Sequence, residues 1–225
     1  MTPLTMSEDE RAAADRLLLE RWPGPGGPVR LEVGLHPPSH PCTPCSSARS
    51  LLRWLEEERP DVEANEIAPV VPGREGEASP PPWIRILLTG EEDGPVRFLG
   101  PPRGANLSAF LEVLQESAQG TAPTGAWADL LSRLRRHHLV RVFTEASAGD
   151  TGPLVRALAR LSRAAYPRLS LDVVDVATFP AWAKRHGLRA LPTVTVDDVG
   201  QFYGSPEEEE LRAALEEVLP SGSWP

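Results

Sequence analysis

The sequence predicts an α/β protein made of two similar units in tandem. Its 225 residues suit two domains of roughly 100 residues each. The same order of helical and β-type segments occurs twice, at an offset of roughly 105 to 110 residues, which is the sign of an internal repeat. Because helices alternate with strands in both halves, we expect a mixed sheet flanked by helices in each. We place the two units at residues 1–117 and 118–225.

Each half opens with an amphipathic helix and a short β run. The first helix, Ser7 to Trp22, starts with the Ser-x-x-Glu pattern of a capping box. Trp127 to His137 repeats the helical pattern in the second half. The β runs that follow are Val29 to Leu35 and Leu139 to Phe143.

The rest of each half also repeats. The second helices, SSARSLLRWLEEERP and PLVRALARLSRAAYP, end at Pro60 and Pro167. A strand candidate follows, then a proline with a β-hairpin, and closing helices start near Leu107 and Leu211. This order, β-α-β-(α)-β-β-α, is that of thioredoxin. The predicted fold is therefore α/β with two tandem thioredoxin-like units, each a mixed central sheet flanked by helices, joined by the linker Ala118 to Thr124.

Composition excludes several classes of partner. The net charge of -9 argues against nucleic acid as a partner, because binding to phosphates depends on clustered cations. No apolar run approaches the ~18 residues that cross a bilayer, so we expect no membrane association. The N-terminal segment carries acids where a signal peptide carries positive charge. These features predict a cytoplasmic protein.

The chemistry of this chain is expected at its only two cysteines, Cys42 and Cys45. A reducing compartment does not sustain structural disulfides, so redox or metal chemistry remains. The CxxC lies between a predicted strand and a helix, which places Cys42 at the helix start, where free N–H groups and the helix dipole lower a thiol's pKa. A protonated His40 lowers it further. Cys45, one turn into the helix, is expected to be more buried and to resolve the mixed disulfide.

Two alternatives stay open at this point. The stretch HPPSHPCTPC offers a Cys2His2 metal set from His36, His40, Cys42 and Cys45. The other alternative is a non-catalytic interaction protein that keeps the fold and a relict thiol pair. Outside this region, His137 and His138 are expected to be a solvated end of a helix, where an exposed cation is favourable.

Three segments carry a resemblance to a known family: CTPC before a helix, VRFLGPPRGANLSAFLEVL and FPAWAKRHGLRALPTVTV. The whole chain resembles the tandem, glutaredoxin-like protein disulfide oxidoreductases of hyperthermophiles. It is also similar to the N-terminal domain of flavoprotein alkyl hydroperoxide reductases. The resemblance implies dithiol-disulfide exchange through Cys42 and Cys45, with a cis-proline at Pro82 and another at Pro192.

The resemblance also implies the surroundings of this reaction. Thr43, Pro44, Pro81 and Pro82 fall where such proteins contact the substrate. The partners would be a disulfide-containing protein or small molecule and a reductant, either a thioredoxin-reductase-like flavoprotein or a similar donor. No bound cofactor is expected. Such a protein serves electron transport and cell redox homeostasis.

The chain departs from the family pattern in three places. Glu145 to Pro153 stands where the second CxxC is usual, so the second unit has no thiol chemistry. The connection from Ile67 to Pro82 is expected to have lost or shortened its helix. Finally, the HPPSHP insertion ahead of Cys42 alters the rim of the site. Since Pro81 has no N–H, we predict weaker pairing with extended polypeptides and a preference for a small disulfide or a dedicated partner.

Overall fold

The computed structural model describes residues 7–21, 28–67, 81–87, 93–119, 126–148, 151–198 and 200–219. The elements of the first half are α1 (Glu8–Arg21), β1 (Val29–Gly34), α2 (Thr43–Glu58), β2 (Val62–Ile67), β3 (Trp83–Ile86), β4 (Val96–Leu99) and α3 (Ala105–Gln119). Those of the second half are α4 (Ala126–Arg133), β5 (His138–Thr144), α5 (Gly152–Ala165), β6 (Leu169–Asp175), α6 (Pro180–Arg185), β7 (Thr193–Val196), β8 (Gly200–Tyr203) and α7 (Glu208–Val218).

The strands form one eight-stranded sheet in the order β2-β1-β3-β4-β6-β5-β7-β8. In each half the first two strands pair in parallel and the hairpin strands pair antiparallel. The halves meet where β4 pairs in parallel with β6. The predicted pair of mixed α/β units is confirmed, and both units belong to one continuous sheet. The boundary between residues 117 and 118 stays a prediction, since α3 runs through it to Gln119.

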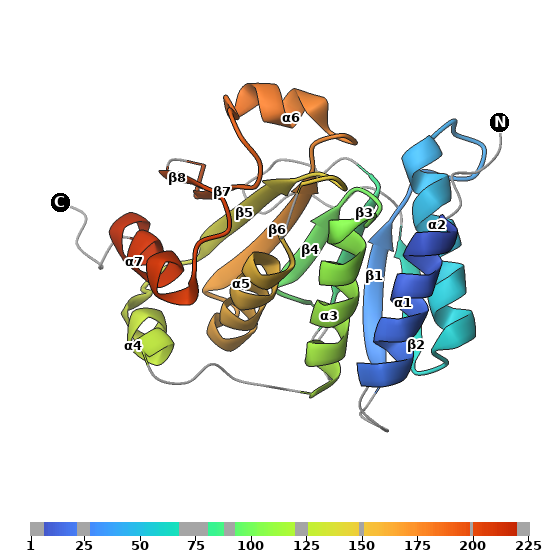
Figure 1. Cartoon of the computed structure of the whole chain (residues 1–225), viewed down its shortest axis with the longest axis horizontal. Coiled ribbons are helices and arrows are strands. Elements are labelled where there is room, and N and C mark those ends of the chain that lie inside the picture. The colour runs from blue at the N-terminus through green and yellow to red at the C-terminus, as the bar shows by residue number, and fades with distance from the viewer. Residues whose placement is uncertain are drawn as a thin grey trace.

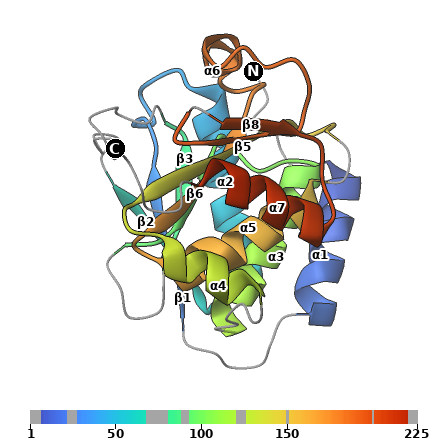
Figure 2. The ribbon, with the colours of Figure 1, turned by 90° about the vertical axis from the view of Figure 1, so that its left-hand side faces the viewer.

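Helices α2, α3, α5 and α7 lie on one face of the sheet, and α1 lies on the same side and packs against α3 (Figures 1 and 2). Their apolar sides and the strand residues facing them form the main core, in which α2 places Leu51, Leu52 and Leu55. A smaller cluster of Trp83, Leu99, Phe143 and Val174 packs with Phe179 and Trp182 of the α6 region. Neighbouring residues Phe98 and Leu99 join different clusters because strand side chains alternate between the two faces.

A row of charged residues crosses the middle of the sheet in register. Glu32, Arg85, Arg97, Asp172 and Arg141 come from β1, β3, β4, β6 and β5 and are successive cross-strand partners. At the seam between the halves, Arg97 donates Nε and Nη2 to the two carboxylate oxygens of Asp172 at 2.9 and 2.8 Å. Such bidentate pairs are the strongest charge-assisted hydrogen bonds. The Arg97–Asp172 ion pair therefore joins β4 to β6 through side chains, in addition to their backbone pairing.

The start of α1 confirms the predicted capping box. Ser7 Oγ accepts a hydrogen bond from Glu10 N at 3.1 Å, and Ser7 N donates to Glu10 Oε2 at 2.9 Å. The lost helix predicted between Ile67 and Pro82 falls mainly on residues 68–80, which lie outside the described residues. Most of the predicted linker, residues 120–124, lies outside them too. Within the described ranges, no helix is long and apolar enough to cross a membrane.

The prediction of a solvated helix end at His137 and His138 is wrong. Helix α4 stops at Arg133, and His138 begins β5 with its side chain buried. Its Nδ1 lies 2.9 Å from an Asp197 carboxylate oxygen, and His137 Nε2 lies 2.9 Å from Ser170 Oγ. The apolar positions of the helix end at Leu134, and the polar residues 135–138 that follow carry no pattern that marks where the helix stops; pairing of His138 with Leu169 on β6 decides that the strand begins there.

Candidate redox site

Cys42 and Cys45 lie at the start of α2 and are joined by a disulfide, with 5.3 Å between their Cα atoms. Cys42 is the N-cap of the helix, in extended backbone conformation, and its Sγ accepts a hydrogen bond from Cys45 N at 3.2 Å. Pro44 falls in the first turn, where the helix has no use for its missing N–H. The sequence CTPC therefore folds locally into a capped helix start with sulfur at the cap.

The two sulfurs differ in burial. The Cys45 side chain is fully buried in the main core, whereas Cys42 is half-buried at its edge. In the reduced state Cys42 would thus be the thiol that a substrate reaches, and Cys45 the one that waits behind it. The arrangement matches the predicted roles of attacking and resolving thiol, and those roles remain a prediction.

Pro82 lies at the same end of the sheet as the disulfide. Trp83, the first residue of β3, pairs with Gly34, the last residue of β1, from which the chain leads to Cys42. The peptide bonds before Pro82 and Pro192 are both cis. Their surroundings match in the two halves, because Pro82 O accepts from Gly100 N and Pro192 O from Gly204 N, each at 2.8 Å. The cis-prolines expected from the resemblance are confirmed.

The loop ahead of Cys42 holds its two histidines against each other, with 4.2 Å between the ring centroids. Arg49 of α2 fixes this loop by donating to His36 O at 2.5 Å and to Glu66 at 2.6 Å. The His40 side chain is exposed to solvent. Over the described part of the chain, no group of three or more His, Cys, Asp or Glu side chains could hold a metal ion.

The second unit has a helix start at the matching place, without thiols and with a different cap. Thr151 is the N-cap residue of α5 but has helical backbone conformation and makes no side-chain cap hydrogen bond, whereas Cys42 is extended and its Sγ caps α2. Leu154 lies three residues after Thr151, with Pro153 between them, as Pro44 lies between the cysteines of α2. Thr151 Oγ1 donates to Ala148 O at 3.0 Å and is fully buried. A threonine and a leucine therefore occupy the positions of Cys42 and Cys45, and the sequence has no other cysteine to replace them.

The structure adds a turn that the sequence analysis did not assign to the site. Gly100 to Gly104 follows β4 and lies against loops of the second unit. A Cβ atom on Gly100 would lie 2.8 Å from Asp175 Cβ, and one on Gly104 would lie 2.4 Å from Ala146 O, so both positions need glycine. Arg103 of this turn donates to Ser47 Oγ at 2.6 Å. The segment VRFLGPPRG carries the signal in Gly100, Arg103 and Gly104, but it does not show what these residues contact.

A cavity of about 290 Å³ adjoins the redox motif and is shared by the two units. Thr43 and Pro44 line it from the first unit, together with Pro101, Arg103 and Asn106; Ala146, Asp175, Ala177 and Thr178 line it from the second. The cysteine-free unit therefore supplies one wall of the space beside the CxxC.

No protein-family model and no curated protein matches this sequence. Among solved structures, a protein disulfide oxidoreductase from Aeropyrum pernix K1 is similar at a TM-score of 0.76 and 20% identity, covering 95% of this chain and 93% of that one. The alkylhydroperoxide reductase AhpF from Enterococcus faecalis is similar at a TM-score of 0.74 and 16% identity, covering 91% and 98%. The similarity shows that this chain has the tandem thioredoxin-like fold along most of its length. These are the two kinds of protein that the sequence resembled.

Proposed function

We propose that this protein is a thiol-disulfide oxidoreductase that works through Cys42 and Cys45. The observation that carries the proposal is the Cys42–Cys45 disulfide at the start of α2, with one half-buried and one fully buried sulfur. A helix N-terminus stabilises a thiolate, and a second thiol three residues on is within bonding distance of the first.

The reaction balances without any further group. The Cys42 thiolate attacks one sulfur of a substrate disulfide, forms a mixed disulfide and releases the first substrate thiolate. The Cys45 thiolate then attacks Cys42 Sγ, releasing the second. Two electrons pass from the protein dithiol to the substrate, and the two thiol protons end on the two products. An external dithiol, such as that of a thioredoxin-reductase-like flavoprotein, restores the reduced pair by the reverse steps.

We propose that several residues support this reaction without taking part in the electron transfer itself. Thr43 and Pro44 would present the motif to the substrate, and Pro81 and Pro82 would form the opposite rim. We propose that His40, when protonated, favours the Cys42 thiolate by a small amount, because it is exposed. The units 1–117 and 118–225 would then be a redox unit and a unit that shapes the site.

The substrate preference follows from Pro81, which is half-buried and precedes the cis-proline. A residue at this position can pair its N–H and C=O with an extended peptide, but proline has only the C=O. Losing one hydrogen bond costs about 0.5 to 1.5 kcal/mol, and leaving the substrate carbonyl unsatisfied costs about 1 to 3 kcal/mol. We therefore propose a small disulfide or a dedicated partner as the substrate. We also propose that the protein acts in the cytoplasm, in electron transport and redox homeostasis.

One experiment tests the reaction itself. The purified protein is equilibrated in redox buffers of graded potential, and the state of Cys42 and Cys45 is read by alkylation and mass. A single two-electron transition, with reduction of a model disulfide that Cys42→Ser abolishes, supports the proposal. Residual turnover well above background in Cys42→Ser would remove it. Thr151→Ser is a matched control, because it alters the corresponding N-cap position of the second unit and should leave turnover unchanged.

A further inference from the structure

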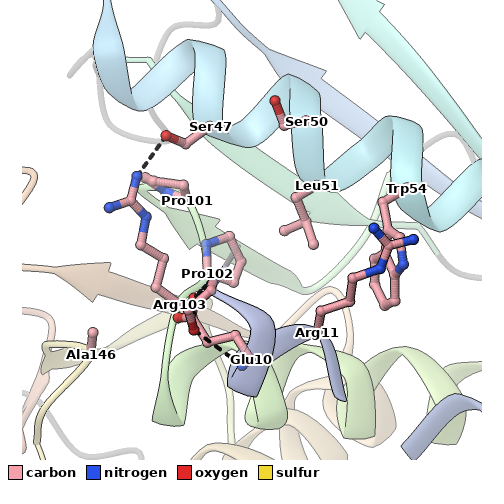
Figure 3. Close-up of a pocket in the computed structure, with 11 residues that line it drawn as sticks. Glu10, Arg11, Ser47, Ser50, Leu51, Trp54, Pro101, Pro102, Arg103 and Ala146 are labelled. Carbon is pink, nitrogen blue, oxygen red and sulfur yellow. Dashed lines mark hydrogen bonds between the residues drawn. The ribbon is translucent and has the colours of Figure 1, made fainter. Parts of the chain in front are cut away.

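A second cavity, of about 370 Å³, lies between α1, α2 and the turn at residues 101–103 (Figure 3). Its lining comprises Ser7, Glu10, Arg11, Ser47, Ser50, Leu51, Trp54, Pro101, Pro102, Arg103 and Ala146. The volume is in the range of small-molecule sites, about 300 to 1,000 Å³. It adjoins the cavity beside the CxxC, since Pro101, Arg103 and Ala146 line both.

The walls of this cavity are largely apolar. Leu51 and Trp54 of α2 and both prolines of the turn are buried side chains that line it. In Figure 3, Leu51 lies in the middle, Arg103 with Ser47 at one end, and Arg11 with Trp54 at the other. An apolar ligand body would thus rest between two guanidinium groups.

The carboxylate oxygens of Glu10, an acidic side chain that lines the cavity, already accept hydrogen bonds. Glu10 Oε1 accepts from Gly104 N at 2.8 Å, and its Oε2 accepts from Ser7 N at 2.9 Å. Burial alone would raise the pKa of Glu10, but these hydrogen bonds and the charge of Arg103 hold it below its ordinary value. Glu10 is therefore an anion, and both of its carboxylate oxygens accept hydrogen bonds from N–H groups of the protein. Ser50 donates its hydroxyl hydrogen to Ser46 O at 3.1 Å, within its own helix, so it offers no O–H to a ligand.

The arginine and tryptophan side chains of the cavity, by contrast, have N–H groups that could donate to a ligand. Arg103 donates to Ser47 Oγ, which leaves most of its five N–H groups for another acceptor. Arg11 is exposed and lies 4.0 Å from Glu58, too far for a hydrogen bond. In the part of the chain that the structure describes, Trp54 Nε1 is buried without a hydrogen-bond partner. A surplus of donors over an apolar wall calls for a ligand that brings acceptors and negative charge.

We propose that this cavity binds a small organic acid, with its carboxylate or phosphate on Arg103 and its apolar body against Leu51, Trp54 and Pro102. Arg103 is the main anchor because it is half-buried and its fork is oriented by Ser47. Arg11 adds a weaker, solvent-screened attraction at the far end. The site is distinct from the exchange chemistry and does not require it.

The site is one hydroxyl away from the redox motif. Ser47 Oγ, which accepts from Arg103, donates to Thr43 O at 3.2 Å, inside the CxxC turn. An acid bound to Arg103 therefore joins a hydrogen-bond chain that ends between the two cysteines. The bound acid would therefore lie close to the redox motif, separated from Thr43 by the Arg103 and Ser47 side chains.

The test is calorimetric titration of the full oxidised chain with 2-naphthoate, 2-naphthyl phosphate and the neutral 2-naphthalenemethanol. The acids should bind, and the alcohol should bind about tenfold or more weakly, since a charge-assisted hydrogen bond is lost. The tighter of the two acids identifies the headgroup. Equal affinity for acids and alcohol, or no binding of either acid at millimolar concentration, overturns the proposal.

Variants locate the binding. Arg103→Gln should weaken acid binding about tenfold or more, and Arg11→Gln about two- to fivefold. Arg30→Gln is the matched control, because Arg30 is a surface arginine of β1 paired with Glu63 and does not line the cavity; its affinity should equal that of the parent. Unchanged binding by Arg103→Gln overturns the assignment, whatever the result with Arg11→Gln. The double variant Cys42→Ser with Cys45→Ser should bind the acid as the parent does, so the outcome is independent of the exchange reaction.

Discussion

The ion pair at the seam of the sheet makes a quantitative prediction. Asp172 is almost fully buried and takes both hydrogen bonds of Arg97, while Arg141 Nε lies 3.6 Å away. Burial alone would lower the pKa of Arg97, yet the Asp172 carboxylate raises it above its ordinary value. Replacing Asp172 by leucine would leave a buried guanidinium with its main counter-charge removed. Breaking a buried pair in this way costs about 3 to 5 kcal/mol.

Thermal and urea unfolding at pH 7 measure this cost. For a chain of this size, about 1 kcal/mol corresponds to about 2 to 4 °C, so Asp172→Leu should lower the melting temperature by roughly 6 to 20 °C. The double variant Arg97→Leu with Asp172→Leu should recover much of the loss, because no unpaired charge is left at that position. Glu63→Gln, which breaks the exposed Arg30–Glu63 pair, should change stability by less than about 1 kcal/mol. A loss below about 1 kcal/mol in Asp172→Leu would refute the reasoning.

Three further predictions concern the site and the second unit. In Cys45→Ser, Cys42 should alkylate with a midpoint below the free-thiol value of about 8.5, measured as rate against pH; a midpoint at or above it contradicts the assignment. Pro81→Thr should raise the turnover of a peptide disulfide by about tenfold and leave the turnover of a small-molecule disulfide unchanged. Equal rates of the variant and the parent on both substrates would contradict the substrate preference. Burial alone would raise the pKa of Asp197, but hydrogen bonds from His138 and Leu139 N and the charges of His138 and Arg136 lower it. The stability that the Asp197 carboxylate contributes is therefore fully present above the ordinary aspartate pKa of about 3.9 and is lost as the pH falls through the lower pKa of the folded state. Asp197→Asn should therefore cost about 1 to 3 kcal/mol of unfolding free energy at pH 7 and progressively less in acid, as measured by urea unfolding.

The local features of the fold were readable from the sequence because each depends on residues close together in the chain. The capping box at Ser7, the CxxC at the start of α2 and the hairpin of β3 with β4 all matched the expected positions. Helix α4 was the exception. There the polar residues 135–138 do not mark the end of the helix, and the pairing of His138 with Leu169 on β6 decides where the strand begins.

The sequence by itself determined the class of fold, the repeat and the pair of cysteines on a helix start, because periodicity, capping and spacing act over a few residues. Only the tertiary structure decided how the repeats are joined and what surrounds the site. Arg97 meets Asp172 across 75 positions, and Glu10 meets Gly104 across 94. The wall that Ala146 and Asp175 supply beside the CxxC comes from the other repeat. Such contacts depend on the register of β4 against β6, and no short stretch of sequence encodes that register.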